Sequence, residues 1–141
     1  MTSHLLAFLL SAATATSALA QESTLQVTLT GIGHDRGSMR VGLYDDPKTF
    51  RKEAHALAIQ QVPAATGTVT VSFPALAAGR YAIMAYHDED GDGELDRRFG
   101  MFPTEGYRLS KDPTVSGPPA FEDSAFEVGA DPASISIAIR Y

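Results

Sequence analysis

RYAIMAYHDEDGDGELD, residues 80–96, contains the two patterns that decide how the rest of the chain is interpreted. Its first half, residues 80–87, is apolar at nearly every position, which is typical of a strand buried on both faces in the centre of a sheet. Its second half places acidic residues at alternate positions, followed by a glycine. We therefore expect a central strand that runs directly into an acidic loop.

The acidic half follows the pattern D-x-D-x-D-G-x-x-D, in which a short loop wraps around a hard cation. Carboxylates at loop positions 1, 3 and 5 converge on one ion, and the glycine at position 6 allows the sharp turn. Position 7 offers its backbone carbonyl, and position 9 binds directly or through water. The acidic residues at positions 1, 3, 5, 7 and 9 are Asp88, Asp90, Asp92, Glu94 and Asp96. The pattern predicts a Ca²⁺ loop with these ligands; a solvated acidic turn is the alternative, because Asp and Gly are also turn residues.

The loop is not a complete EF-hand. Position 12, normally a bidentate glutamate, is Phe99, and the flanking sequence does not predict two helices. The remaining ligands must come from elsewhere in the fold, from a main-chain carbonyl or from water. The affinity for Ca²⁺ is then expected at the weak end, about 10⁻⁴ to 10⁻³ M. Mg²⁺ fits less well, because it demands rigid octahedral geometry and retains its waters.

The net charge of −6 comes from this loop. Six of the 17 acidic residues lie between 88 and 96, and the rest of the chain has 11 acidic and 11 basic residues. A neutral remainder argues against nucleic-acid binding, which needs a basic face. The absence of cysteine excludes disulfides, thiolate metal sites and cysteine nucleophiles.

Residues 1–20 have the pattern of a secretory signal peptide. The run Leu5–Leu10 is a short apolar core, and Ala18-Leu19-Ala20 is a small-residue cleavage site before Gln21. The apolar run is too short to span a bilayer. We expect export, cleavage after Ala20 and a mature chain, 21–141, without a transmembrane segment, in the periplasm or outside the cell.

The mature part has the length of one domain, and its dominant hydrophobic period is two. Alternation is clear in the segments 25–29, 39–43, 57–59, 69–73 and 135–141. Asp46-Pro47 is typical of a helix start and predicts one or two helical turns through Ala54. About seven short strands with little helix predict a single antiparallel β-sandwich.

The stretch 97–125 is rich in Gly and Pro and has little periodicity. Its aromatic residues are too many for a disordered linker: Phe99, Phe102, Tyr107 and Phe121. We expect an ordered segment that covers the sandwich, either as packed cover or as a lid over a ligand.

Four segments of the chain resemble a widespread family of exported bacterial proteins known as a domain of unknown function. They are 79–82, 87–96, 100–107 together with Ser110, and 117–126. The resemblance implies a signal peptide and a single β-sandwich of immunoglobulin-like or transthyretin-like (prealbumin-like) character. Family members typically carry Asn at one or more of the positions filled here by Asp90 and Asp92, so this loop is more acidic than most. The strand and loop are also similar to repeat modules of bacterial surface adhesins, in which the calcium loop stiffens a sandwich.

His87 shares a strand face with Tyr81, Ile83 and Ala85, and two roles are open for it. It is a general base or transition-metal ligand beside the carboxylates, or a half-buried histidine hydrogen-bonded to Glu122, Asp123 or a backbone carbonyl. His34 and His55 are expected to be solvated. Contacts with the metal-binding side chains or with a bound ligand are expected from His87, Glu105, Tyr107, Phe121, Glu122 and Asp123.

The sequence contains no nucleophile elbow, phosphate loop or dinucleotide fingerprint. The function expected from the sequence is therefore an exported, non-enzymatic calcium-binding β-sandwich. Its role would be structural, or the binding of a protein, a glycan or a small ligand. A periplasmic metal-dependent hydrolase that uses His87 with the acidic cluster is the alternative.

Overall fold

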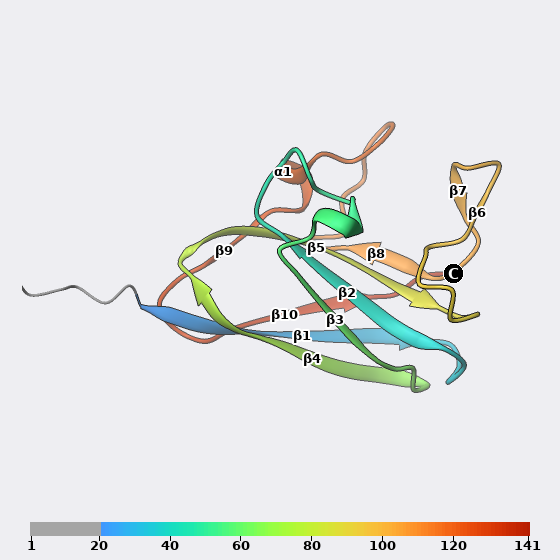
Figure 1. Ribbon diagram of the computed structural model, residues 1–141, viewed down its shortest axis with the longest axis horizontal. Coiled ribbons are helices and arrows are strands. Elements are labelled where there is room, and N and C mark those ends of the chain that lie inside the picture. Colours follow the sequence, from blue (N-terminus) through green and yellow to red (C-terminus); the bar gives the residue numbers. More distant parts are fainter. Residues whose placement is uncertain (1–20) are drawn as a thin grey trace, which may run out of the picture.

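The computed structural model describes residues 21–141, which form two stacked β-sheets (Figure 1). The predicted signal peptide, 1–20, lies outside the described residues. In chain order the elements are β1 (Glu22–Ile32), β2 (Ser38–Tyr44), the 3₁₀ turn η1 (Glu53–His55), β3 (Ala58–Pro63), β4 (Gly67–Ala77), β5 (Gly79–Asp88), β6 (Arg97–Arg98), β7 (Phe102–Pro103), β8 (Tyr107–Leu109), α1 (Phe121–Ser124), β9 (Phe126–Val128) and β10 (Ala133–Ala138). The predicted helical turns after Asp46 are reduced to a turn and η1.

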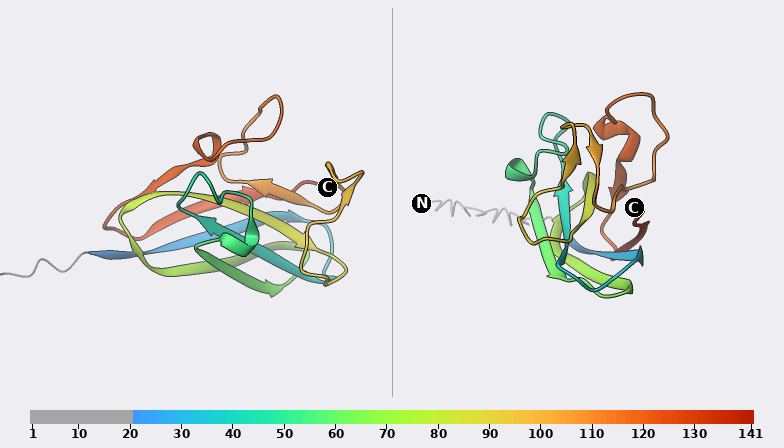
Figure 2. Two further views of the ribbon diagram at one scale, coloured as in Figure 1. Left: turned by 45° about the horizontal axis from the view of Figure 1, so that its top comes forward. Right: turned by 90° about the vertical axis from the view of Figure 1, so that its right-hand side faces the viewer.

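The predicted β-sandwich is confirmed. One sheet has the order β10-β1-β4, and the other has the order β3-β2-β5-β8 with β9 also paired to β5 (Figure 2). The strand β5 is central, as its sequence predicts, with β2 on one edge and both β8 and β9 on the other. One pairing differs from the antiparallel expectation, since β1 and β10 run parallel.

The main core lies between the two sheets and is built from alternate residues of their strands. On β1, β2 and β5 the inward positions are 25, 27 and 29, then 39, 41 and 43, then 81, 83 and 85. All nine of these side chains are buried. The apolar residues that alternate in the sequence are therefore the side chains that are buried between the two sheets.

A second core covers the outer face of the larger sheet. It consists of Tyr44, Phe50, Ala82, Met84, Tyr86, Leu109, Phe121 and Ala125. Several of these residues belong to the segment 97–125, which confirms the prediction that this segment covers the sandwich. The helix α1 contributes Phe121, whose ring packs edge-on against Phe50 at 5.9 Å between centroids.

Ser110 fastens this covering segment to β5. Its hydroxyl accepts a hydrogen bond from the Ile83 amide (2.9 Å) and donates one to the Ser124 carbonyl (2.6 Å). Its own amide donates to the Ile83 carbonyl (2.9 Å). Ile83 lies between the stretches of β5 that pair with β9 and with β8, so Ser110 satisfies backbone groups that neither strand reaches.

Within residues 21–141 there is no helix long and apolar enough to span a membrane.

Phe121 and Phe99 provide a matched test of this packing. Phe121 is buried, whereas Phe99, in the same segment, is 84% exposed. We expect Phe121→Ala to lower the free energy of unfolding by about 3–5 kcal/mol. Phe99→Ala should change it by no more than about 0.5 kcal/mol. Urea unfolding followed by circular dichroism measures both; equal losses would contradict the assignment of Phe121 to a second core.

Candidate metal centre

Asp88 is the last residue of β5 and folds the acidic loop around its own carboxylate. It is 1% exposed, and its Oδ1 and Oδ2 accept hydrogen bonds from the amides of Gly91 (3.0 Å) and Gly93 (2.9 Å). Gly93 has a φ of 79°, a left-handed conformation that glycine adopts without steric cost. The glycine at loop position 6 is therefore required by the turn.

Asp90 and Asp92 repeat this local bonding on the exposed side of the loop. The Oδ1 of Asp90 accepts from the Asp92 amide (3.1 Å), and the Oδ1 of Asp92 accepts from the Glu94 amide (2.8 Å). The hydrogen bond from the Asp92 amide is the main cause that lowers the pKa of Asp90. These local hydrogen bonds fix the curvature of the loop.

Glu105, nine residues after Asp96, holds the loop together from outside it. It is 5% exposed, and its two oxygens accept hydrogen bonds from the amides of Glu89 (2.9 Å) and Asp96 (3.1 Å). The adjacent Thr104 amide donates to the Asp96 carbonyl (2.8 Å). The sequence placed Glu105 among the contacts of the site, and the structure places its carboxylate at the loop itself.

The carboxylates form two groups that share Asp90. One contains Asp88, Asp90 and Glu105, and the other contains Asp90, Asp92 and Asp96; in each, one oxygen per residue lies within 4.8 Å of the others. Oxygens bound to one Ca²⁺ at about 2.4 Å are at most about 5 Å apart, so either group has the spacing of a partial calcium shell.

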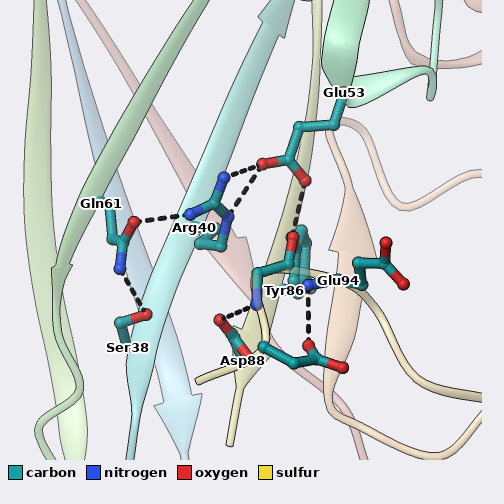
Figure 3. Close-up of polar contacts among 9 residues, drawn as sticks. Ser38, Arg40, Glu53, Gln61, Tyr86, Asp88 and Glu94 are labelled. Carbon is teal, nitrogen blue, oxygen red and sulfur yellow. Dashed lines mark hydrogen bonds and ion pairs between the residues drawn. The ribbon is translucent and has the colours of Figure 1, made fainter. Parts of the chain in front are cut away.

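The pKa of Asp96 reflects the repulsion among these carboxylates. Partial burial, together with the charges of Glu105, Asp90 and Asp92, raises the pKa of Asp96 to about 6. A hard cation would offset this repulsion. The carboxylate of Glu94 belongs to neither group and lies on the outer-face side of the loop (Figure 3), which is compatible with a ligand role through its backbone carbonyl.

The turn between β1 and β2 packs against the base of the loop. Gly37 has a φ of 72°, and a Cβ at this position would lie 2.0 Å from the Asp88 carbonyl oxygen. A side chain at this position would therefore displace the start of the loop. The sequence gives no signal for this contact beyond a glycine in a predicted turn.

His87 is completely buried beside the loop, on the inward face of β5, and both ring nitrogens are engaged. Its Nε2 lies 2.6 Å from the Arg36 carbonyl, which only accepts, so Nε2 carries the proton. Its Nδ1 therefore accepts from the Tyr141 hydroxyl at 2.6 Å. That hydroxyl in turn accepts from the Gly33 amide at 3.1 Å. The ring is hydrogen-bonded at both nitrogens and links three segments of the chain.

The expectation that His87 bonds to a backbone carbonyl is confirmed, but the predicted partners Glu122 and Asp123 are wrong. Glu122 pairs with Arg80 (2.6 Å), and Asp123 accepts from the Ala120 amide (2.8 Å). Arg80 and His87 are seven positions apart on β5, about 23 Å at the rise of a strand. The helix α1 therefore docks at the opposite end of β5.

The remaining predicted contacts lie outside the carboxylate groups of the loop. Tyr107 is in β8 and forms a bridge with Arg140, and Phe121 is in the second core. His34 was expected to be solvated, which is wrong: it is half-buried, contacts Glu89, and has its ring centroid 4.4 Å from that of His87. His55 is exposed, as expected.

Fold and site together define a class: β-sandwich proteins whose central strand ends in a buried aspartate and an acidic loop. The chain belongs to the family described as "Uncharacterized protein conserved in bacteria (DUF2141)", which matches residues 27–136. This confirms the resemblance to a bacterial domain of unknown function, and the match includes the whole loop and Glu105. No curated protein and no solved structure matches the chain.

Removing the Tyr141 hydroxyl tests the buried histidine link. Tyr141→Phe leaves Nδ1 of His87 without a donor inside the protein, and we expect a loss of about 1–3 kcal/mol in the free energy of unfolding. The measurement is the urea midpoint at neutral pH. An unchanged midpoint would mean that the Arg36 carbonyl alone holds the ring.

The pKa of Asp96 gives a pH dependence in calcium-free buffer. Folded Asp96 keeps its proton up to about pH 6, whereas unfolded aspartate loses it near 3.8. Between these values the folded state binds more protons, so stability falls as the pH rises. The unfavourable contribution is absent below about pH 4 and complete above about pH 6. Thermal unfolding across this range should show the fall, and Asp96→Asn should remove it; an identical fall in the variant would contradict the assignment.

Proposed function

We propose that this protein is an exported, non-enzymatic β-sandwich protein whose 88–96 loop binds Ca²⁺ in the periplasm or outside the cell. The observation that carries the proposal is the position of Glu105. This buried carboxylate comes from outside the loop and lies in one group with Asp88 and Asp90. It supplies an acidic oxygen from elsewhere in the fold, in place of the glutamate that is missing from loop position 12.

The proposed role of the ion is structural. The loop follows β5, which carries both cores, and Glu105 lies two residues before β8. An ion bound between Asp88, Asp90 and Glu105 would join these two segments and offset the repulsion of their carboxylates. It would stiffen one end of the sandwich, where β2, β5 and the covering segment meet.

The alternative, a metal-dependent hydrolase that uses His87, has less support. A general base needs a free nitrogen within reach of the substrate. The ring of His87 is 0% exposed and bonded at both nitrogens. A metal at His87, His34 and Glu89 would have to displace the Tyr141 or Arg36 contact. The loop therefore supports a binding or structural role better than a catalytic one.

Thermal unfolding in EGTA and then in millimolar Ca²⁺, with Mg²⁺ as the control, tests the calcium site. With a dissociation constant of about 10⁻⁴ to 10⁻³ M, Ca²⁺ at about 10 mM is present at roughly 10–100 times that constant and adds about 1.4–2.7 kcal/mol to stability. For a domain of this size, this raises the melting temperature by roughly 3–10 °C. A rise equal in Mg²⁺, or no rise, would contradict the proposal.

Asp90 and Glu94 form a matched pair of variants. Asp90 belongs to both carboxylate groups, while the Glu94 carboxylate belongs to neither. Asp90→Ala should abolish most of the calcium-dependent rise, and Glu94→Ala should preserve it, because its backbone carbonyl remains. Asp88 is less suitable, since its carboxylate also holds the amides of Gly91 and Gly93. An equal loss of the calcium-dependent rise in both variants would indicate a general effect of negative charge rather than binding by specific carboxylates.

Export has its own test. The full chain, expressed in a bacterium, should appear in the periplasmic fraction or the medium with Gln21 as its first residue. Intact mass of the purified protein gives the cleavage position. Retention of residues 1–20 in the cytoplasmic fraction would contradict export.

A further inference from the structure

The outer face of the larger sheet carries two adjoining cavities. One, of about 480 Å³, lies over β2 and β5 and is lined by polar residues that include Arg40, Glu53 and Tyr86. The other, of about 510 Å³, lies toward β7 and β8 and is lined mainly by apolar residues such as Phe102 and Leu109. Each volume is in the range of small-molecule sites, about 300–1,000 Å³.

The two cavities share a wall and form one groove. Arg51, Met84, Leu95 and Arg97 line both of them. We call the combined space the outer groove. Its two ends differ in chemistry, so a ligand that fills it must be polar at one end and apolar at the other.

At the polar end, the positive charge of Arg40 is already paired with a carboxylate. Glu53 accepts from its guanidinium, with a 2.8 Å bond from Nε, and the Gln61 side chain accepts from Nη1 at 2.5 Å (Figure 3). Tyr86 donates to the other oxygen of Glu53 at 2.6 Å. Burial and this carboxylate raise the pKa of Tyr86, so its hydroxyl remains a donor. This hydrogen-bonded network forms a rigid floor at the polar end of the groove, and its charges are already paired.

Two other arginines of the groove carry positive charge without such a partner. Among residues 21–141, neither Arg51 nor Arg97 forms a salt bridge. The Nε of Arg51 is buried and has no hydrogen-bond partner in this described part of the chain. A buried unpaired donor is costly, and a bound anion that drew the Arg51 guanidinium toward it would relieve that cost. Glu94 lies at the rim and leaves the groove with one net positive charge, in a protein whose net charge is −6.

At the other end, the groove opens between apolar side chains that face water. Met101 is 68% exposed and Phe102 is 61% exposed, and Pro118 and Pro119 line the same cavity. Large side chains of this kind, next to a cavity, mark surfaces that take up apolar ligands.

We propose that the outer groove binds an amphipathic carboxylate, a small molecule with one carboxylate head and an apolar tail. The head lies between Arg51 and Arg97, whose planar guanidinium groups match a carboxylate. The tail lies along Met84 toward Phe102 and the two prolines. The groove is a site separate from the carboxylate groups of the calcium loop, so the inference goes beyond the calcium proposal.

Isothermal titration of the purified protein with octanoate tests the groove. Octanol, which has the same tail without charge, and acetate, which has the head without the tail, are the comparison ligands. We expect saturable one-to-one binding of octanoate, at least about tenfold tighter than either comparison ligand. No saturable binding of octanoate, or octanol binding equally well, would overturn the proposal.

Arg97 and Arg98 provide the matched variants. They are adjacent and both exposed, and only Arg97 lines the groove. Arg97→Gln should weaken octanoate binding about tenfold, and Arg98→Gln should leave it unchanged. Phe102→Ser, also a substitution at an exposed position, should weaken the binding of octanoate. Acetate should not become the preferred ligand of this variant. Equal weakening by Arg97→Gln and Arg98→Gln would show general charge attraction and overturn the assignment.

The same titrations in EGTA and in Ca²⁺ keep the two proposals distinguishable. If octanoate binds in either buffer and this binding depends on Arg97, the result supports the groove, whether or not the loop binds Ca²⁺. A calcium-dependent rise in melting temperature without octanoate binding supports the calcium site and overturns the groove.

Discussion

The burial of β5 on both faces is the constraint on which the rest of this structure depends. Its inward residues complete the core between the sheets, and its outward residues, Ala82, Met84 and Tyr86, require a second cover. The chain meets that requirement with the segment 97–125, which Ser110 fastens to the middle of the strand. A strand with no solvated face cannot shift its register without exposing one core or the other.

The same constraint positions the candidate site. Because β5 stays buried to its last residue, Asp88 enters the acidic loop as a buried carboxylate rather than a surface one. Alternation sends His87 inward, where it joins the Arg36 and Tyr141 segments, and sends Asp88 outward to the loop. The covering segment then brings Glu105 against the loop and forms the wall of the outer groove. One central strand therefore places two cores, an acidic loop and a cavity.

Much of the fold could be predicted from local pattern. The period of two identified the inward positions of β1 and β2, and the apolar run 80–87 identified the central strand, because burial follows directly from alternation. The carboxylates of the loop could be predicted for the same reason, since their spacing is local. The parallel pairing of β10 with β1 could not, because period-two alternation is the same in either direction.

The sequence by itself determined the strands, the central place of β5, and the order of carboxylates from Asp88 to Asp96, since each depends on neighbours within a few residues. Only the tertiary structure decided which groups come together: the carboxylate of Glu105 with the loop amides, Tyr141 with His87, and Arg51 and Arg97 in the lining of one groove. The physical reason is that no local spacing places these groups together, and their contacts are set by how the sheets, their turns and the covering segment pack. The misplaced Glu122 and Asp123 show the same limit, because the end of β5 at which α1 docks is fixed by packing against Phe50 and not by any spacing in the sequence.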